Sequence, residues 1–405
     1  MLKLYLVGTA DTKFAELEYL KNILVKSDIP IIWVDLSTTV HSFDCDISAN
    51  EVAGYHRHGA DAVLAGSDRG KAVAAMGEAF AAYCKANLSQ IGGIIGIGGG
   101  GGTSMISAGM RELPYGIPKI IVSTLASGDT SPFVDTSDII MMPSVTDIAG
   151  LNFLSRIILT NAANAISGMV AAAPVEGNSN IKTIGMSMFG VTTPAVTHLV
   201  HLVDQQVPKQ YEAMVFHATG TGGRTMEKLL LEGHLEGLID LTTTEIADHV
   251  CGGVLSAGPG RLDAVAETRA PYVGAPGALD MVNFWAPDTI PDQFADRHFY
   301  HHNANVTLMR TTPQECKKIG KWLAAKLNAC EGEVRFLIPE KGLSALDIEG
   351  GDFWLRESDE ALFDALEANL KISSKRKLVR LPLHINDPEF SAAALEQYLE
   401  IAPQS

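Results

Sequence analysis

A run of five glycines is the part of the sequence best suited to bind an anion. The apolar segment 92–97 resembles a strand, and it leads into Gly98, Gly99, Gly100, Gly101 and Gly102, followed by Thr103. We expect these glycines to form a loop with positive φ values, against which a ligand could approach the main chain closely. A helix over 103–112 would then direct its free N–H groups at a phosphate or carboxylate. The spacing matches neither the P-loop nor the dinucleotide fingerprint, so a purely structural turn is the alternative.

Two other polar segments also follow predicted strands. Ligands of open α/β sheets bind at the carboxyl ends of strands, so both segments could face the ligand of the glycine run. Lys13 could neutralise a phosphate, or it could be solvated while a neighbouring side chain caps a helix. The hydroxyl-rich segment 123–131 could donate hydrogen bonds to a ligand or form a solvated turn. The candidate ligand-binding residues in these segments are Gly8, Thr9, Asp11, Lys13, Ser127 and Gly128.

The second half of the chain contains a similar pattern. A predicted strand runs through a Thr/Gly turn into a helix, and the candidate residues for binding a small anionic substrate are Thr219, Gly220, Thr221, Gly222, Gly223 and Arg224. Arg224 could clamp an oxyanion and stabilise developing negative charge. Glu245 or His302 is the candidate for proton transfer. The sequence lacks the ligand spacing of a dedicated transition-metal site, so none is expected.

Composition limits the class of protein. The chain has 405 residues with 46% hydrophobic and 19% charged residues, as expected for a well-buried globular protein of two domains. The formal net charge of −16 argues against a nucleic-acid or membrane partner. Five scattered cysteines favour a reducing compartment. The apolar segment 157–175 contains polar residues and is expected to be a buried helix, and the start of the chain lacks a signal-peptide pattern, so we expect a cytoplasmic protein.

Strand-like and helix-like segments alternate along the chain, which predicts an α/β fold with parallel sheets covered by helices. In the first half we expect strands at 4–7, 30–35, 62–65, 92–97, 119–123 and 139–142, and helices at 11–26, 69–87 and 152–169. The polar segment 174–180 is the expected boundary. In the second half we expect strands at 181–186, 213–217 and 238–241, and helices at 194–205, 223–232, 313–328 and from 388.

Several motifs together resemble those of an uncharacterised protein family of bacteria, fungi and plants, which includes the N-terminal region of a tomato inhibitor of tobamovirus RNA replication. The similar segments are 8–13, 101–104, 117–119, 123–128, 143–152, 218–224, 253–262 and 277–284. The resemblance implies two Rossmann-like domains with mainly parallel sheets, and the boundary at 174–180 places them at 1–174 and 181–405. The two anion-binding segments in adjoining domains suggest a cleft between them. The resemblance also implies a homodimer that binds ATP in its first domain, with Gly8, Thr9 and residues 98–103 as the leading nucleotide contacts.

Two functions fit these observations. The first is a metabolic enzyme that uses ATP with a small anionic second substrate, by phosphoryl transfer, ligation or hydrolysis, with Mg²⁺ as an optional companion. The alternative is a non-catalytic module whose response to nucleotide regulates a partner. The absence of a recognisable nucleophile or metal triad in the sequence favours the alternative.

Overall fold

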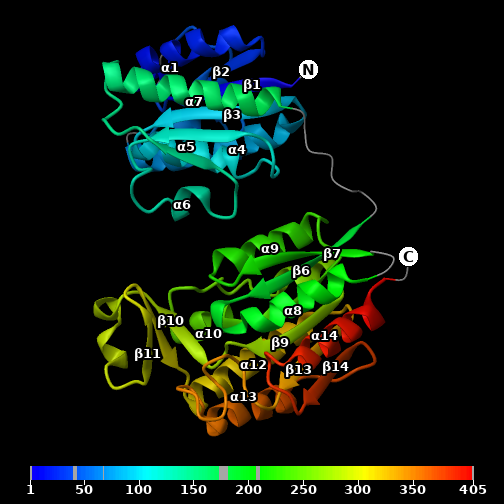
Figure 1. Cartoon of the computed structure of the whole chain (residues 1–405). Helices are drawn as coiled ribbons and strands as arrows, with labels where there is room; N and C mark the ends of the chain where they lie inside the picture. Colours follow the sequence, from blue (N-terminus) through cyan, green and yellow to red (C-terminus); the bar gives the residue numbers. More distant parts are fainter. Residues whose placement is uncertain (1, 40–42, 67, 173–180, 207–209, 404–405) are drawn as a thin grey trace. The chain divides into compact units, whose positions relative to one another are not determined.

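A computed structural model describes residues 2–39, 43–66, 68–172, 181–206 and 210–403. The chain divides into two compact units, Met1–Glu176 and Gly177–Ser405, which are shown in Figure 1. Each unit contains a parallel β-sheet with helices packed against it, so the α/β prediction is confirmed. The expected boundary at 174–180 lies outside the described residues.

The first domain is built on five parallel strands in the order β2-β1-β3-β4-β5. Its strands are β1 (Lys3–Gly8), β2 (Ile31–Asp35), β3 (Ile91–Gly98), β4 (Lys119–Ser123) and β5 (Ile140–Pro143). Its helices are α1 (Ala10–Leu24), α2 (Ala49–Ala53), α3 (Asp61–Leu64), α4 (Arg69–Ala86), α5 (Gly100–Met110), α6 (Ser131–Val134) and α7 (Phe153–Ala171), with 3-10 turns at Val25–Ser27 and Leu88–Gln90.

Two hydrophobic layers enclose this sheet. Helices α1 and α7 pack on one face, where Leu6, Ile95 and Leu159 are buried, and α4 and α5 pack on the other, where Tyr5, Ile94 and Phe80 are buried (Figure 1). The connection after β1 leads to one side of that strand, and the connection after β2 crosses to β3 on the other side. The strand order therefore reverses between β1 and β3, and such a switch point is where ligands of open α/β sheets bind.

The second domain is built on six parallel strands in the order β14-β13-β9-β8-β6-β7. Its strands are β6 (Lys182–Met188), β7 (Tyr211–His217), β8 (Gly237–Thr242), β9 (Tyr272–Gly277), β10 (Met281–Phe284), β11 (Phe299–Asn303), β12 (Val306–Arg310), β13 (Val334–Pro339) and β14 (Arg376–Leu381). Its helices are α8 (Thr193–Asp204), α9 (Thr221–Leu231), α10 (Thr244–Cys251), α11 (Asp263–Thr268), α12 (Pro313–Ala329), α13 (Arg356–Asn369) and α14 (Pro388–Ile401), with 3-10 turns at Gly190–Thr192, Pro287–Thr289 and Asp292–Phe294.

The two parallel sheets share a strand order. In the second domain β7, β6, β8, β9 and β13 follow one another as β2, β1, β3, β4 and β5 do in the first, and β14 is added at the edge. The switch point of the second sheet consequently lies between β6 and β8. The glycines 98–102 lie at the end of β3, which borders the first switch point. The glycine-containing segment 219–223 follows β7, which corresponds to β2 and lies one strand away from the second switch point.

One local expectation was wrong, and one small sheet was not predicted. Residues 62–65 belong mostly to the short helix α3 rather than to a strand; a run of four apolar residues has no periodicity that separates the two, and of these Val63 alone is buried. Strands β10, β12 and β11 form a separate antiparallel sheet, which is not among the strands predicted from the sequence.

Two helix predictions held. Thr312 caps α12 as expected: its hydroxyl accepts from the Glu315 N–H at 3.3 Å, and the Glu315 carboxylate accepts from the Thr312 N–H at 2.8 Å. The helix expected at 152–169 is α7, which packs on the first sheet, but only one of its faces is buried: Ile157 is 52% exposed, so the segment from 157 is not the fully buried helix that was expected. Within the described residues, no helix combines the length and apolar character needed to cross a membrane.

Candidate functional site

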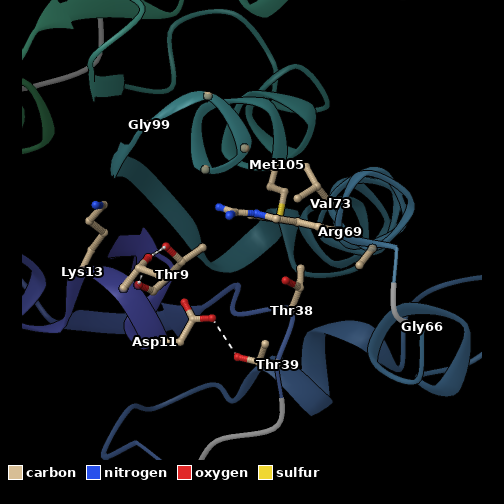
Figure 2. A pocket seen from close by; sticks show the side chains of 15 residues that line it. Thr9, Asp11, Lys13, Thr38, Thr39, Gly66, Arg69, Val73, Gly99 and Met105 are labelled. Atoms are coloured by element: carbon tan, nitrogen blue, oxygen red, sulfur yellow. Dashed lines mark hydrogen bonds between the residues drawn. The ribbon is translucent and has the colours of Figure 1, made fainter. Parts of the chain in front are cut away.

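A cavity of about 450 Å³ lies at the switch point of the first sheet. It opens at the carboxyl ends of β1 and β3 and is also bordered by residues after β2 and by the start of α4 (Figure 2). Its volume is within the range of small-molecule sites. The lining residues are Thr9, Asp11, Thr12, Lys13, Thr38, Thr39, Gly66, Arg69, Ala72, Val73, Gly99, Gly100, Gly101, Gly102 and Met105.

The glycine run is the start of a helix rather than a loop. Helix α5 begins at Gly100 with Gly99 as its N-cap, and no residue of 98–102 has a positive φ, which corrects the expected backbone conformation. Because the N-cap is glycine, no side chain caps this helix. The N–H groups of Gly100, Gly101 and Gly102 precede the first intrahelical hydrogen bond, which joins Thr103 N–H to the Gly99 carbonyl at 2.9 Å. The helix start is thus open toward the cavity.

Packing does not explain these glycines. A Cβ placed on Gly99, Gly100 or Gly102 would come no nearer than 3.6 Å to its surroundings, and one on Gly101 would lie 3.4 Å from Val73. Such distances are ordinary van der Waals contacts. Since φ is also negative, alanine would fit the fold at these positions. The missing side chains leave room in the cavity instead, as required where a ligand approaches the backbone.

Two cations flank the helix start. Arg69, at the first position of α4, extends into the cavity, and Lys13 approaches from the opposite side (Figure 2). Arg69 is exposed, and its guanidinium forms no ion pair or hydrogen bond with any described residue, whereas the Lys13 ammonium donates to the Ile148 carbonyl. Arg69 is a site residue that the sequence reading missed. Its signal was the helix start after Asp68, whose carboxylate caps α4.

The floor of the cavity is made of hydroxyl and carboxylate groups. One Asp11 oxygen accepts from the Thr39 hydroxyl at 2.8 Å, and the other has no partner among the described residues. Thr9 and Thr12 share a hydrogen bond of 2.8 Å between their hydroxyls. A carboxylate oxygen without a partner is a type of ligand that Mg²⁺ takes in proteins.

Several other predicted contacts support the site without lining this cavity. Gly98 is required by packing, because a Cβ there would lie 2.8 Å from the Thr103 nitrogen. A Cβ on Gly8 would lie 2.9 Å from a terminal methyl group of Leu17, which would have to move. Thr103 is buried, and its hydroxyl is 2.7 Å from that of Ser123. Ser127 lines a different cavity, beyond β4, while Gly128 is exposed in the same loop.

The second glycine turn is already filled by a carboxylate of the chain itself. The Glu245 Oε1 atom accepts from the N–H groups of Gly220 at 2.6 Å and Gly223 at 2.9 Å. This is the position where the sequence predicted a substrate anion. Arg224 is exposed and its guanidinium lies 3.4 Å from the Thr221 hydroxyl, whereas His302 lies on β11 in the small antiparallel sheet. No hydrogen bond or ion pair within the described residues joins Glu245 to Arg224 or His302.

Glu245 belongs to a buried ion network rather than to an open pocket. Its second oxygen accepts from Arg261 Nε at 3.0 Å, and the same guanidinium binds Glu227 at 3.0 Å and Asp240 at 2.8 Å. Arg261 is 2% exposed and Glu245 is fully buried. Burial raises the pKa of the Glu245 carboxyl, and Arg261 opposes this effect. The network fastens α9, α10 and β8 to the segment before α11.

Packing does explain the glycines of this second turn. A Cβ on Gly222 would lie 1.8 Å from the His217 carbonyl oxygen, and one on Gly223 would lie 2.0 Å from the Glu245 carboxylate. Gly220 has a φ of +84°, and its Cβ would lie 2.7 Å from the Ser256 carbonyl oxygen. These glycines let the backbone close around Glu245. Sequence alone gave no sign that a residue 22 positions beyond Gly223 would occupy the turn.

Comparisons with known proteins place the chain in a family. The N-terminal domain model of the uncharacterised protein family UPF0261 matches residues 2–174, and the C-terminal domain model matches residues 181–402. A UPF0261 protein of Mesorhizobium japonicum is 56% identical over 402 residues, covering 99% of this chain and 100% of the relative. A UPF0261 protein of Rhizobium meliloti shows the same identity and coverage.

A plant protein is also similar. The ToMV resistance protein Tm-1 of Solanum lycopersicum is 42% identical over 426 residues, which cover 100% of this chain and 56% of the tomato protein. The resemblance noted from the motifs is therefore confirmed over both domains. The chain belongs to the UPF0261 family.

Proposed function

We propose that the first domain binds ATP, with the phosphates at the open start of α5. The observation that carries this proposal is the set of glycines 99–102, which the fold does not require and which border a cavity at the sheet's switch point. In a helix, glycine is less favourable than alanine by up to about 1 kcal/mol per residue. A ligand that contacts the backbone offers a physical reason to keep them.

The side chains around the cavity suit a triphosphate. Phosphate oxygens would accept from the N–H groups of the first turn of α5, and the Arg69 guanidinium would form a charge-assisted, bidentate contact. Lys13 would supply a second positive charge from the opposite side. The Asp11 carboxylate, one oxygen of which is buried without a partner, would be the protein ligand of a Mg²⁺ ion that also contacts the phosphates.

The use made of the nucleotide separates two proposals. Phosphoryl transfer or ligation needs a site for the anionic second substrate, which was expected at the 219–224 turn, and Glu245 occupies that turn. This observation favours the second candidate, a nucleotide-responsive regulatory module. Incubating the protein with ATP and Mg²⁺ and measuring ADP formation, alone and with metabolite mixtures, distinguishes them. A homodimer and a cytoplasmic location stay predictions.

Nucleotide binding can be tested by calorimetric titration of the purified chain with ATP, ADP and AMP. We expect affinity to fall as phosphates are removed. Arg69→Met should weaken ATP binding at least about tenfold, because a hydrogen-bonded charge is lost. Arg57→Met is the matched control, since Arg57 is an exposed arginine of the same domain that does not line the cavity. Equal ATP affinity of the wild type and Arg69→Met, or no saturable binding by the wild type, would contradict the proposal.

A further inference from the structure

A second cavity, of about 460 Å³, lies at the carboxyl ends of β4 and β5. Two loops line it, one over 123–127 after β4 and the other over 143–147 after β5. None of its lining residues lines the cavity beside Gly99–102. The proposed function leaves it without a role.

The second cavity is a neighbour of the first. A Cβ on Gly99 would lie 3.7 Å from the Thr124 hydroxyl, so the start of α5 borders the loop after β4. Lys13, which lines the first cavity, donates to the carbonyl of Ile148, the residue that follows the loop of the second. Glu16 accepts from the Gly150 N–H at 2.6 Å, so α1 holds that loop at two points.

Hydroxyl groups dominate the polar lining. Within the part of the chain that the structure describes, Thr124 and Ser127 form no hydrogen bond through their hydroxyls, and the Thr146 hydroxyl is buried without a partner. Ser123 and Ser144, by contrast, are engaged with protein groups at 2.7 Å and 2.6 Å. The Thr124 and Ser127 hydroxyls can donate to and accept from a ligand with several hydroxyl groups.

The charge of the lining selects the ligand further. Asp147 is its one ionisable residue, and neither lysine, arginine nor histidine is present. One Asp147 oxygen accepts from the Ile148 N–H at 2.8 Å, which leaves the other able to accept from a ligand. A second phosphate or carboxylate would meet repulsion here, whereas an ammonium group would be attracted. In the same loop, Val145 has a φ of +62°, which is a costly backbone conformation for a β-branched residue.

We propose that this cavity binds a second small molecule: a polyhydroxylated compound that is neutral or carries an ammonium group. The proposal that the cavity binds such a compound depends only on the residues that line it. The further proposal that this compound is the second substrate of a nucleotide-using enzyme rests on the proposed function. The substrate class then differs from the anionic compound expected from the 219–224 turn.

Three sugars of one skeleton and different charge test the proposal: glucosamine, glucose and glucuronate, titrated at millimolar concentrations and slightly acidic pH into the full chain with and without ATP. We expect glucosamine to bind most tightly and glucuronate most weakly. Asp147→Asn keeps an oxygen for the Ile148 N–H and should weaken glucosamine binding about tenfold while leaving ATP affinity unchanged. Asp129→Asn is the control, because Asp129 is an exposed carboxylate of the loop after β4 that does not line the cavity.

A second variant tests the shape of the cavity rather than its charge. Ser127→Leu fills the exposed rim of the cavity and should abolish binding of both glucosamine and glucose, with ATP affinity retained. The proposal is overturned if none of the three sugars binds, if glucuronate binds most tightly, or if Asp147→Asn lowers ATP affinity as Arg69→Met does. Sugar binding without ATP binding would instead overturn the proposed function alone, and ATP binding without sugar binding would overturn the second site alone.

Discussion

Each domain has a glycine-rich segment at the carboxyl ends of the strands of its parallel sheet, and the two sheets share a strand order, but the two segments are used differently. In the first domain, the start of α5 is uncapped and faces a cavity between Lys13 and Arg69. In the second, the Glu245 carboxylate accepts from two N–H groups of the turn and joins a buried ion network. One turn is open to a ligand, and the other contains a protein group with the chemistry of a ligand.

The difference shows how a structural glycine can be told from a functional one. At Gly222 a side chain would collide with backbone, so the fold itself requires glycine. At Gly100 a side chain would make an ordinary contact 3.7 Å from Leu125, and φ is not positive. The sequence shows two Thr/Gly-rich turns of similar appearance, and the space around each Cβ position separates them. Three experiments sharpen this comparison. The first removes Glu245 from the turn of the second domain, the second changes the protonation of carboxyl groups in that domain, and the third adds side chains to the glycines at the start of α5.

The largest effect is expected from Glu245→Ala. The change leaves the N–H groups of Gly220 and Gly223 without their acceptor and removes one carboxylate from Arg261, so the second domain should lose about 3–5 kcal/mol of stability. Added formate can occupy the vacated position and should restore part of that loss. Urea unfolding followed by pulse proteolysis, which resolves the two domains as fragments, measures both effects.

Glu236→Ala serves as the control for this change. Glu236 forms a partly exposed ion pair with Lys182 at 2.8 Å, and losing such a pair should cost at most about 1 kcal/mol. If formate stabilises Glu245→Ala no more than it stabilises the wild type, the second turn does not bind a free anion when Glu245 is absent.

A pH effect of intermediate size should also separate the domains. In the second domain Arg310 lies among Asp280, Asp347 and Asp359, and burial raises the pKa of all three carboxyl groups, that of Asp359 to about 7. Repulsion between the carboxylates adds to this shift, and Arg310 opposes it.

A carboxyl group with a raised pKa binds its proton more tightly in the folded chain, so it favours folding at low pH. That contribution is lost as pH rises from about 4 toward 7, at about 1.4 kcal/mol per pH unit for each proton by which the two states differ. In the first domain, by contrast, hydrogen bonding by Ser131 lowers the pKa of Asp129. Pulse proteolysis in urea at pH 5 and pH 7.5 should show the second domain losing stability more than the first. A second domain that gains stability over this interval would contradict the assignment.

The regular framework could be predicted from the sequence because its signals are local. Thr312 and Glu315 form the expected capping box, and the buried run before Gly98 is a strand. The site was predicted in part, since the cavity contains Thr9, Asp11, Lys13 and the glycines. The rest depends on contacts between distant segments: Glu245 reaches the second turn from another helix, and Arg69 reaches the first cavity from the start of α4. Neither contact has a periodicity or spacing that a sequence shows.

The smallest change in stability, and the sharpest test of the comparison, comes from filling the open turn. Gly100→Ala and Gly101→Ala, singly and together, should stabilise the first domain by up to about 1 kcal/mol each, because alanine fits there and favours the helix. The same variants should weaken ATP binding, since the added methyl groups narrow the cavity.

Gly222→Ala, the matched change in the second domain, should lower stability because its Cβ would lie 1.8 Å from the His217 carbonyl oxygen. Stability is read from urea unfolding and affinity from calorimetric titration. If Gly100→Ala and Gly101→Ala destabilise the domain as Gly222→Ala does, both turns are structural and the glycines give no support for a ligand. If the two variants instead stabilise the domain and weaken ATP binding, the glycines cannot be purely structural. A purely structural segment would become more stable with alanine and would have no ligand affinity to lose.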